Sequence, residues 1–236
     1  MQNLIKAFDA LGIEYNDKMI EQFREYMDML LEWNEKVNLT AIKEKDEFIK
    51  KHYIDSVICH GFPEMKNAET IIDVGTGGGF PGIPLAIIFP EKQFVLMDSL
   101  LKRLKIIDEL TEKLDIDNVR TLHGRAEDLG RNKEHRENYD ICVSRAVANL
   151  ATLSEYCLPF IKVGGSFLAY KAVKAEEEIK AAKGAVHLLG GTISREEKVE
   201  LPDFNLEHNI IVIDKLQNTS AKYPRKAGTP SKEPLK

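Results

Sequence analysis

The fold of this chain is decided by TIIDVGTGGGFPG, residues 70–82. A mostly apolar run at 71–74 ends in a cluster of glycines, and a second apolar run follows at 83–88. Glycine adopts positive φ and lets a ligand approach the backbone closely, because it has no Cβ. A helix that follows such a loop presents its free N–H groups and positive dipole end to the ligand. The stretch therefore predicts a strand, a tight ligand-binding loop and a helix.

Two nucleoside cofactors fit this loop. Residues 77–82 satisfy the G-x-G-x-x-G pattern of dinucleotide-binding proteins. Residues 73–79 satisfy D-x-G-x-G-x-G, which resembles motif I of the Rossmann-like S-adenosylmethionine methyltransferases. The carboxylate of Asp73 suits a cationic amino-acid ligand and would sit poorly beside a pyrophosphate, so we favour S-adenosylmethionine over NAD. We expect Asp73, Gly75, Gly77 and Gly79 to hold the methionine part of this cofactor.

The composition limits the class of protein. The 236 residues are 43% hydrophobic and 30% charged, which is typical of a globular chain. No apolar run approaches the ~20 residues that span a bilayer, and the N-terminus lacks the apolar core of a signal peptide. Cys59, Cys142 and Cys157 show no C-x-x-C spacing and are expected to be reduced thiols. We therefore expect a cytoplasmic protein that has no membrane contact. We also expect it to be monomeric and to bind no metal.

Beyond residue 65 the pattern alternates strand and helix, which predicts a parallel sheet with right-handed crossovers. The last two strand segments follow each other without a helix, so we expect them to close the sheet as an antiparallel pair. The expected fold is α/β: a Rossmann-like class I methyltransferase with a seven-stranded, mostly parallel sheet, an antiparallel last strand and an N-terminal helical extension. Strands are expected over residues 70–74, 93–97, 119–122, 139–144, 166–170, 192–199 and 208–214, and helices over 100–114, 150–160 and 174–186.

The chain divides into three segments. Residues 1–65 form the helical extension, with helices over 17–34 and 46–59. In the second helix, His52 lies near Asp55 and Ser56, but no nucleophile elbow accompanies them, and we interpret His52 as a surface or capping histidine. We expect residues 66–215 to form an S-adenosylmethionine-binding methyltransferase domain. We expect residues 216–236 to form a basic tail that contains proline and glycine. Together with Lys215 the tail carries a charge of about +5, which suits either binding to phosphate groups or a solvated end.

Polar residues follow the second and third strands. Asp98 lies about twenty residues after the glycines, where a carboxylate can accept both ribose hydroxyls of an adenosine. Alternatively it caps the next helix, as Ser99 also can, and we include Ser99 among the cofactor contacts. Ala126 and Glu127 can read the adenine edge with a backbone N–H and a carboxylate, or form an acidic helix N-terminus.

The segment after the fourth strand indicates which kind of atom accepts the methyl group. Residues 144–148 lack the [DNS]-P-P-[YF] motif of amino-methyltransferases. Methylation of a pyrimidine at C5 needs a cysteine nucleophile, and neither Cys142 nor Cys157 has that setting. Guanine N7 fits, because its in-plane lone pair has no proton to lose and needs alignment rather than a base. Arg145 is our candidate catalytic residue; it can bond guanine O6, a phosphate or the cofactor carboxylate, or pair with an acid of the pocket.

Several motifs occur in a fixed order along the chain. They are Trp33-Asn34…Asn38-Leu39-Thr40, His52-Tyr53-Ile54-Asp55-Ser56, residues 73–84, Asp98-Ser99…Lys102-Arg103, Ser144-Arg145-Ala146 and residues 223–230. Together they closely resemble the RsmG (GidB) family over nearly the whole chain. Members of that family use S-adenosylmethionine to methylate a guanine at N7 in small-subunit (16S) ribosomal RNA near the decoding region.

The resemblance implies an rRNA (guanine-N7)-methyltransferase that releases S-adenosylhomocysteine and acts on small-subunit RNA or on an assembling 30S particle. It implies cofactor contacts at Gly75, Phe80, Ala126, Glu127 and Arg145. It also implies RNA contacts at Lys102, Arg103 and Arg125.

We add Lys171 to the RNA contacts, because it follows the fifth strand and should lie at the same edge of the sheet. Phosphate contacts and one splayed base in a pocket would suit such a substrate, with Phe80 or Tyr170 available for stacking. Two alternatives are an NAD-dependent oxidoreductase, whose usual substrate domain is missing here, and a nucleotide-responsive RNA-binding protein without catalysis.

Overall fold

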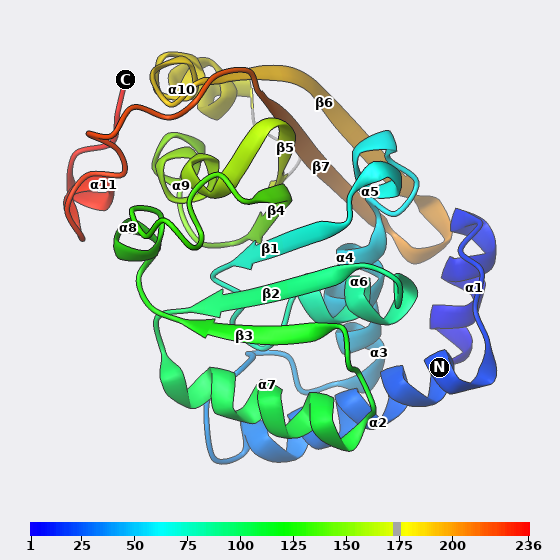
Figure 1. Ribbon diagram of the computed structural model, residues 1–236. Coiled ribbons are helices and arrows are strands. Elements are labelled where there is room, and N and C mark those ends of the chain that lie inside the picture. The colour runs from blue at the N-terminus through cyan, green and yellow to red at the C-terminus, as the bar shows by residue number, and fades with distance from the viewer. Residues whose placement is uncertain (172–175) are drawn as a thin grey trace.

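A mixed β-sheet runs through the centre of the molecule (Figure 1). The computed structural model describes residues 1–171 and 176–236, and within them the sheet has seven strands in the order β3-β2-β1-β4-β5-β7-β6. The strands are β1 (Thr70–Val74), β2 (Gln93–Asp98), β3 (Val119–His123), β4 (Tyr139–Arg145), β5 (Ile161–Lys171), β6 (Gly191–Leu201) and β7 (Leu206–Lys215).

The strand directions confirm the expected fold class. β1 pairs in parallel with β2 and β4, β2 pairs in parallel with β3, and β4 pairs in parallel with β5. β7 lies between β5 and β6 and is antiparallel to both. The strand order reverses between β1 and β4, and ligands bind at such a switch point, outside the carboxyl ends of the strands.

Helices cover both faces of the sheet (Figure 1). Successive side chains of a strand point to opposite faces, so Ile71 joins the core beneath the N-terminal helices and Ile72 joins the core beneath the later helices. The first face carries the N-terminal helices, α6 (Gly82–Ile88) and α7 (Leu101–Lys113), and the second carries α8 (Ala126–Leu129), α9 (Leu150–Cys157), α10 (Glu176–Leu188) and α11 (Thr229–Lys232).

Some of the expected helices have different bounds in the structure. The helix expected over 150–160 ends at Cys157, and a 3₁₀ turn, η2 (Leu158–Phe160), follows it. Pro159 has no N–H to continue the α-helical ladder, which explains the early end. The helix expected over 174–186 is α10, and its expected first residue, Lys174, lies outside the described residues.

The N-terminal extension begins with α1 (Gln2–Leu11) and α2 (Asp17–Asn34). Asn16 caps α2, because its side-chain oxygen accepts from the N–H of Met19 at 2.9 Å. The helix expected over 46–59 is split into α3 (Lys45–Phe48), a π-helical turn η1 (Ile49–Ile54) and α4 (Asp55–Val57). π-helical turns inside helices are frequent at functional sites, and η1 carries His52. A short helix, α5 (Pro63–Asn67), leads into β1.

The C-terminal segment 216–236 is packed against the second face, so of the two alternatives that its charge left open the solvated end is wrong. Tyr223 and Pro230 are buried, and α11 contacts α9. A last 3₁₀ turn, η3 (Pro202–Phe204), joins β6 to β7. None of the helices in the described part of the chain is both long and apolar enough to cross a bilayer.

Candidate functional site

A cavity of about 500 Å³ opens at the carboxyl edge of β1, β2, β3 and β4. Eight of the ten predicted cofactor residues line it: Gly75, Gly77, Phe80, Asp98, Ser99, Ala126, Glu127 and Arg145. Asp73 and Gly79 are not among the lining residues. A larger hollow of about 780 Å³ lies among α1, η1 and η3, but none of the parallel strands ends there. The site therefore lies where the sheet topology places ligands.

Asp73 holds the glycine loop through hydrogen bonds. Its Oδ2 accepts from the hydroxyl of Thr76 at 2.7 Å and from the N–H of Gly82 at 2.9 Å. The residue is fully buried, and burial raises the pKa of Asp73 from 3.8 to about 7 against the opposing effect of these hydrogen bonds. We expected Asp73 to hold the methionine part directly; the structure instead places its carboxylate where it sets the shape of the loop.

Two glycines of the loop are required by close packing. Gly75 has φ +79°, and a Cβ there would lie 2.6 Å from a methyl carbon of Val147. Gly79 has φ +90°, and a Cβ there would lie 2.4 Å from the hydroxyl of Tyr26. That hydroxyl, on α2, donates to the carbonyl of Gly78 at 2.8 Å. The N-terminal extension therefore holds one side of the loop, which the sequence did not indicate.

Asp98 contacts both the glycine loop and the segment that leads into α7. Its Oδ1 accepts from the N–H of Leu100 at 2.9 Å, just ahead of α7. Its Oδ2 accepts from the N–H of Gly77 at 3.0 Å and lies 3.5 Å from Nη1 of Arg103. The carboxylate also lines the cavity at the end of β2. These contacts hold the carboxylate in a fixed direction at the cavity wall.

Ala126 and Glu127 begin α8 directly after β3, and both are largely buried at the cavity wall. Glu127 Oε1 accepts from the N–H of Gly228 at 2.8 Å. Gly228 and Ser231, from the C-terminal segment, also line the cavity. The segment that we expected to hang as a separate tail therefore forms part of the candidate site.

Arg145, at the end of β4, is held in place by the N-terminal extension. Its Nη1 donates to the carbonyl of Lys51 at 3.0 Å and to the carboxylate of Asp55. Its Nη2 donates to Nδ1 of His52 at 3.1 Å, and the guanidinium carbon lies 5.6 Å from the ring centre of Phe80. The sequence allowed a salt bridge to an acid of the pocket; the structure shows a salt bridge to Asp55, which is buried and is not among the residues that line the cavity.

His52 belongs to the site, and its interpretation as a surface or capping residue is wrong. Its ring stacks on Phe80 with centres 4.3 Å apart and planes 6° from parallel. Nε2 lies 2.6 Å from the hydroxyl of Thr40, while Nδ1 accepts from Arg145. Burial and the nearby Arg145 charge lower the pKa of His52 to about 3. His52 is therefore neutral, and its ring connects Thr40 to Arg145 through hydrogen bonds.

Similarity to known proteins identifies the family of the chain. A family model described as "GidB: rRNA small subunit methyltransferase G" matches residues 19–206. The chain belongs to the GidB family. A Ribosomal RNA small subunit methyltransferase G of Clostridium novyi (strain NT) is 51% identical over 97% of this chain and 94% of that protein. Another, of Alkaliphilus metalliredigens (strain QYMF), is 47% identical over 96% of this chain and 95% of that protein.

Similarity to solved structures shows the fold of this chain. An O-methyltransferase from Bacillus cereus in complex with SAH superposes with a TM-score of 0.57 at 17% identity and covers 89% of this chain and 96% of that chain. M. jannaschii TYW2 in complex with AdoMet superposes with a TM-score of 0.54 at 17% identity and covers 75% of this chain and 80% of that chain. The protein has the class I fold of S-adenosylmethionine-dependent methyltransferases.

The GidB motifs that are far apart in sequence meet at this site. Asn34 Oδ1 accepts from the N–H groups of Leu39 and Thr40 at 2.8 and 2.9 Å. This loop geometry brings the Thr40 hydroxyl to His52. One network of hydrogen bonds thus connects the motif near residue 34, the motif near residue 52 and Arg145.

The basic residues predicted to contact RNA have different surroundings. Lys102 and Arg125 are exposed, and Arg103 and Arg125 line the cavity. Lys171 donates to the carbonyl of Ala148 at 2.7 Å and to Glu178 at 2.6 Å, and only 11% of its side chain is exposed. Its proposed RNA contact would require it to leave both partners.

Tyr170 is buried and donates to the carbonyl of Ser56 at 2.6 Å, so the expectation that it could stack on a base is wrong. Phe80 is also largely buried, but it lines the cavity. Apolar exposure at the site comes instead from Leu100 and Val147, which line the cavity with 52% and 41% of their surface exposed.

Proposed function

We propose that this protein transfers the methyl group of S-adenosylmethionine to N7 of a guanine in small-subunit ribosomal RNA, as a monomer in the cytoplasm. The observation that carries the proposal is one cavity, in a GidB family member, which brings the loop after β1, Asp98, Glu127 and Arg145 together. Its relatives are named Ribosomal RNA small subunit methyltransferase G, which supports the choice of substrate.

The residues of the cavity suit the three parts of the cofactor. Gly77 has φ +61° and no atom within 4 Å of the place where a Cβ would lie, so the backbone there is open to the methionine part. Asp98 presents a carboxylate for the ribose hydroxyls, and Ala126 and Glu127 flank the adenine. Asp73 and Gly79 support this binding indirectly, since the first shapes the loop and the second packs against Tyr26. When bound, the cofactor supplies an electrophilic methyl group on a positively charged sulfur.

The acceptor needs orientation rather than deprotonation. Guanine N7 attacks through a lone pair and has no proton to lose, so alignment and exclusion of water supply most of the rate enhancement. Arg145 is held on three sides by Lys51, Asp55 and His52 and keeps its donors in a fixed direction. We assign Arg145 to contact with guanine O6 or the cofactor carboxylate. A pKa of about 3 leaves His52 neutral at physiological pH and unsuited to act as a general acid.

The mouth of the cavity suits a single nucleotide drawn out of an RNA strand. Exposed Lys102, Arg125 and partly exposed Arg103 can contact phosphates around the opening. Leu100 and Val147 offer an apolar surface to the face of the extruded base. This arrangement supports RNA recognition by phosphate contacts and one base pocket.

The proposal is tested by methyl transfer from labelled S-adenosylmethionine into small-subunit RNA and into 30S particles from cells that lack the enzyme. Chemical cleavage at 7-methylguanosine then maps the modified base. The expected result is one labelled guanine at N7, and label at another atom or base would overturn the proposal. Calorimetry with S-adenosylhomocysteine and with NAD tests the cofactor separately, and preferential binding of NAD would exclude a methyltransferase.

A further inference from the structure

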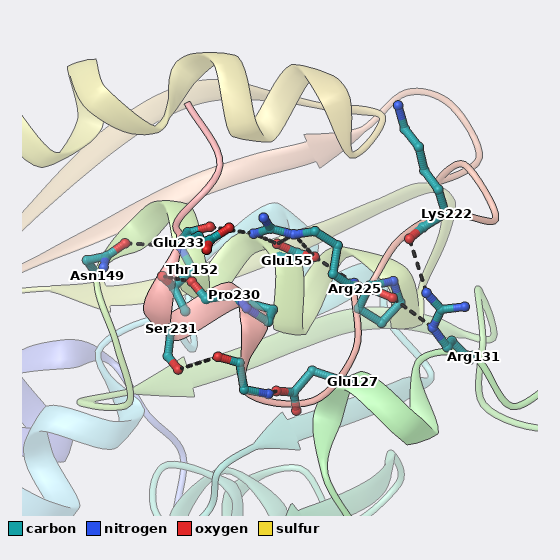
Figure 2. A network of polar contacts seen from close by, with 12 residues as sticks. Glu127, Arg131, Asn149, Thr152, Glu155, Lys222, Arg225, Pro230, Ser231 and Glu233 are labelled. Atoms are coloured by element: carbon teal, nitrogen blue, oxygen red, sulfur yellow. Dashed lines mark hydrogen bonds and ion pairs between the residues drawn. The ribbon is translucent and has the colours of Figure 1, made fainter.

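The C-terminal segment is anchored by a buried ion pair (Figure 2). Glu155, on α9, is 0% exposed. Arg225 donates to its carboxylate through the backbone N–H at 2.7 Å, through Nε at 3.0 Å and through Nη2 at 2.7 Å. A buried carboxylate is tolerated only when it is paired and hydrogen-bonded. The folded core of α9 therefore depends on a residue near the end of the chain.

Further hydrogen bonds hold the backbone on both sides of Arg225 (Figure 2). Arg131 donates to the carbonyl of Pro224 at 2.7 Å and to that of Lys222 at 3.1 Å. The hydroxyl of Thr152 donates to the carbonyl of Pro230 at 3.0 Å, and Pro230 is buried. These contacts give the segment one path across α8 and α9.

That path brings the segment to the cavity. Gly228 has φ +83°, a conformation that favours glycine, and its N–H donates to Glu127 Oε1 at 2.8 Å. Ser231 donates to the carbonyl of Gly228 at 3.1 Å, and both residues line the cavity together with Tyr156. The side chain of Glu127 is thereby fixed by a residue that lies only three positions after Arg225.

We propose that the C-terminal segment is a subsite of the cofactor pocket and that Arg225 is a positioning residue for the adenine end of S-adenosylmethionine. Arg225 fastens the segment to Glu155, the fastened segment places the N–H of Gly228, and Gly228 orients the Glu127 carboxylate. The proposal rests on the placement of adenine beside Ala126 and Glu127 in the proposed function. Both Arg225 and Gly228 lie beyond residues 19–206, the range matched by the family model.

The test is the binding of S-adenosylhomocysteine to Arg225→Ala, measured by calorimetry. Loss of the anchor should weaken binding roughly tenfold, the effect of losing one oriented hydrogen bond, although Arg225 does not line the cavity. Lys226→Ala removes one positive charge from the exposed neighbouring position and should bind as the wild type does. In steady-state methyl transfer, Arg225→Ala should raise KM for S-adenosylmethionine and leave kcat at saturating cofactor within about twofold.

A coupling measurement separates positioning from general loosening of the fold. If Arg225 acts through Glu127, then Glu127→Ala combined with Arg225→Ala should bind no more weakly than Glu127→Ala alone. Independent, additive effects would overturn the proposal. Hydrogen exchange should show loss of protection over residues 226–231 in Arg225→Ala and not in Lys226→Ala.

Failure of this inference is distinct from failure of the proposed function. Wild-type protein that does not bind S-adenosylhomocysteine would contradict the proposed function. Wild-type binding with an unchanged affinity in Arg225→Ala would overturn only the positioning role. If Arg225→Ala does not fold, Arg225→Lys serves instead, because it keeps the charge opposite Glu155 but loses the forked donors. Unchanged affinity in that variant would likewise overturn the proposal.

Discussion

Replacing Asp73 with Asn should change how the stability of the protein depends on pH. Asp73 is fully buried, and burial raises its pKa in the folded protein from 3.8 to about 7. Between these two values the folded protein keeps a proton on Asp73 that the unfolded chain has released. A rise in pH therefore favours unfolding in this window, and below it the folded state has its full stability.

The magnitude follows from the size of the pKa shift. A shift of about three units corresponds to about 4 kcal/mol of unfolding free energy when the whole window is crossed. Between about pH 5 and pH 8 the expected loss is about 3 kcal/mol. The asparagine side chain in Asp73→Asn would keep an oxygen to accept from Thr76 and Gly82 but would have no charge to bury. Any change in stability caused by the asparagine itself is the same at every pH. Only the dependence of the unfolding free energy on pH is therefore diagnostic.

The assay is urea unfolding of the wild type and Asp73→Asn across this range, followed by the fluorescence of Trp33 and by circular dichroism. The wild type should lose about 3 kcal/mol relative to the variant as pH rises from about 5 to 8. Asp108→Asn, at an exposed position on α7, should run parallel to the wild type. Parallel curves for the wild type and Asp73→Asn would show that Asp73 is ionised throughout and would refute the reasoning from burial.

Three further substitutions or titrations examine the site. Asp98→Ala removes the carboxylate assigned to the ribose and the acceptor for Gly77; calorimetry should show S-adenosylhomocysteine binding weaker by roughly 10- to 100-fold, and unchanged affinity would remove Asp98 from the site. Arg145→Lys keeps a charge beside Asp55 but not the fork that also reaches Lys51 and His52; methyl transfer should fall by at least about tenfold with the melting temperature nearly unchanged, and full activity would refute the role of Arg145. His52 should stay neutral between about pH 5 and 8 in an NMR titration assigned with His52→Asn, and protonation near pH 6.5 would contradict its burial against Arg145.

The sequence predicted the features that local patterns determine. The strands, the glycine loop and the place of Asp98 follow from alternation of apolar residues and from turn chemistry, and both act over a few residues. The antiparallel pair of β6 and β7 also followed from the absence of a helix between them. These elements were sufficient to define the sheet edge where the cavity lies.

The remainder of the site depends on contacts between distant parts of the chain. The bonds from Tyr26 to Gly78, from Arg145 to His52 and from Gly228 to Glu127 join residues 52, 93 and 101 positions apart. No periodicity or local motif encodes such pairs. The basic composition of residues 216–236 suited either phosphate binding or a solvated end, and no local pattern indicated that Arg225 pairs with Glu155, 70 positions away.

The position of β7 between β5 and β6 affects the order in which the chain can complete its sheet during synthesis. β6 emerges from the ribosome before β7, yet it reaches the sheet only through β7. Until residues 206–215 have been made, the free edge of β5 exposes its unpaired backbone beside the apolar Phe167 and Leu168. A nascent chain therefore carries an aggregation-prone edge late into translation, and a premature stop before β7 leaves that edge exposed permanently.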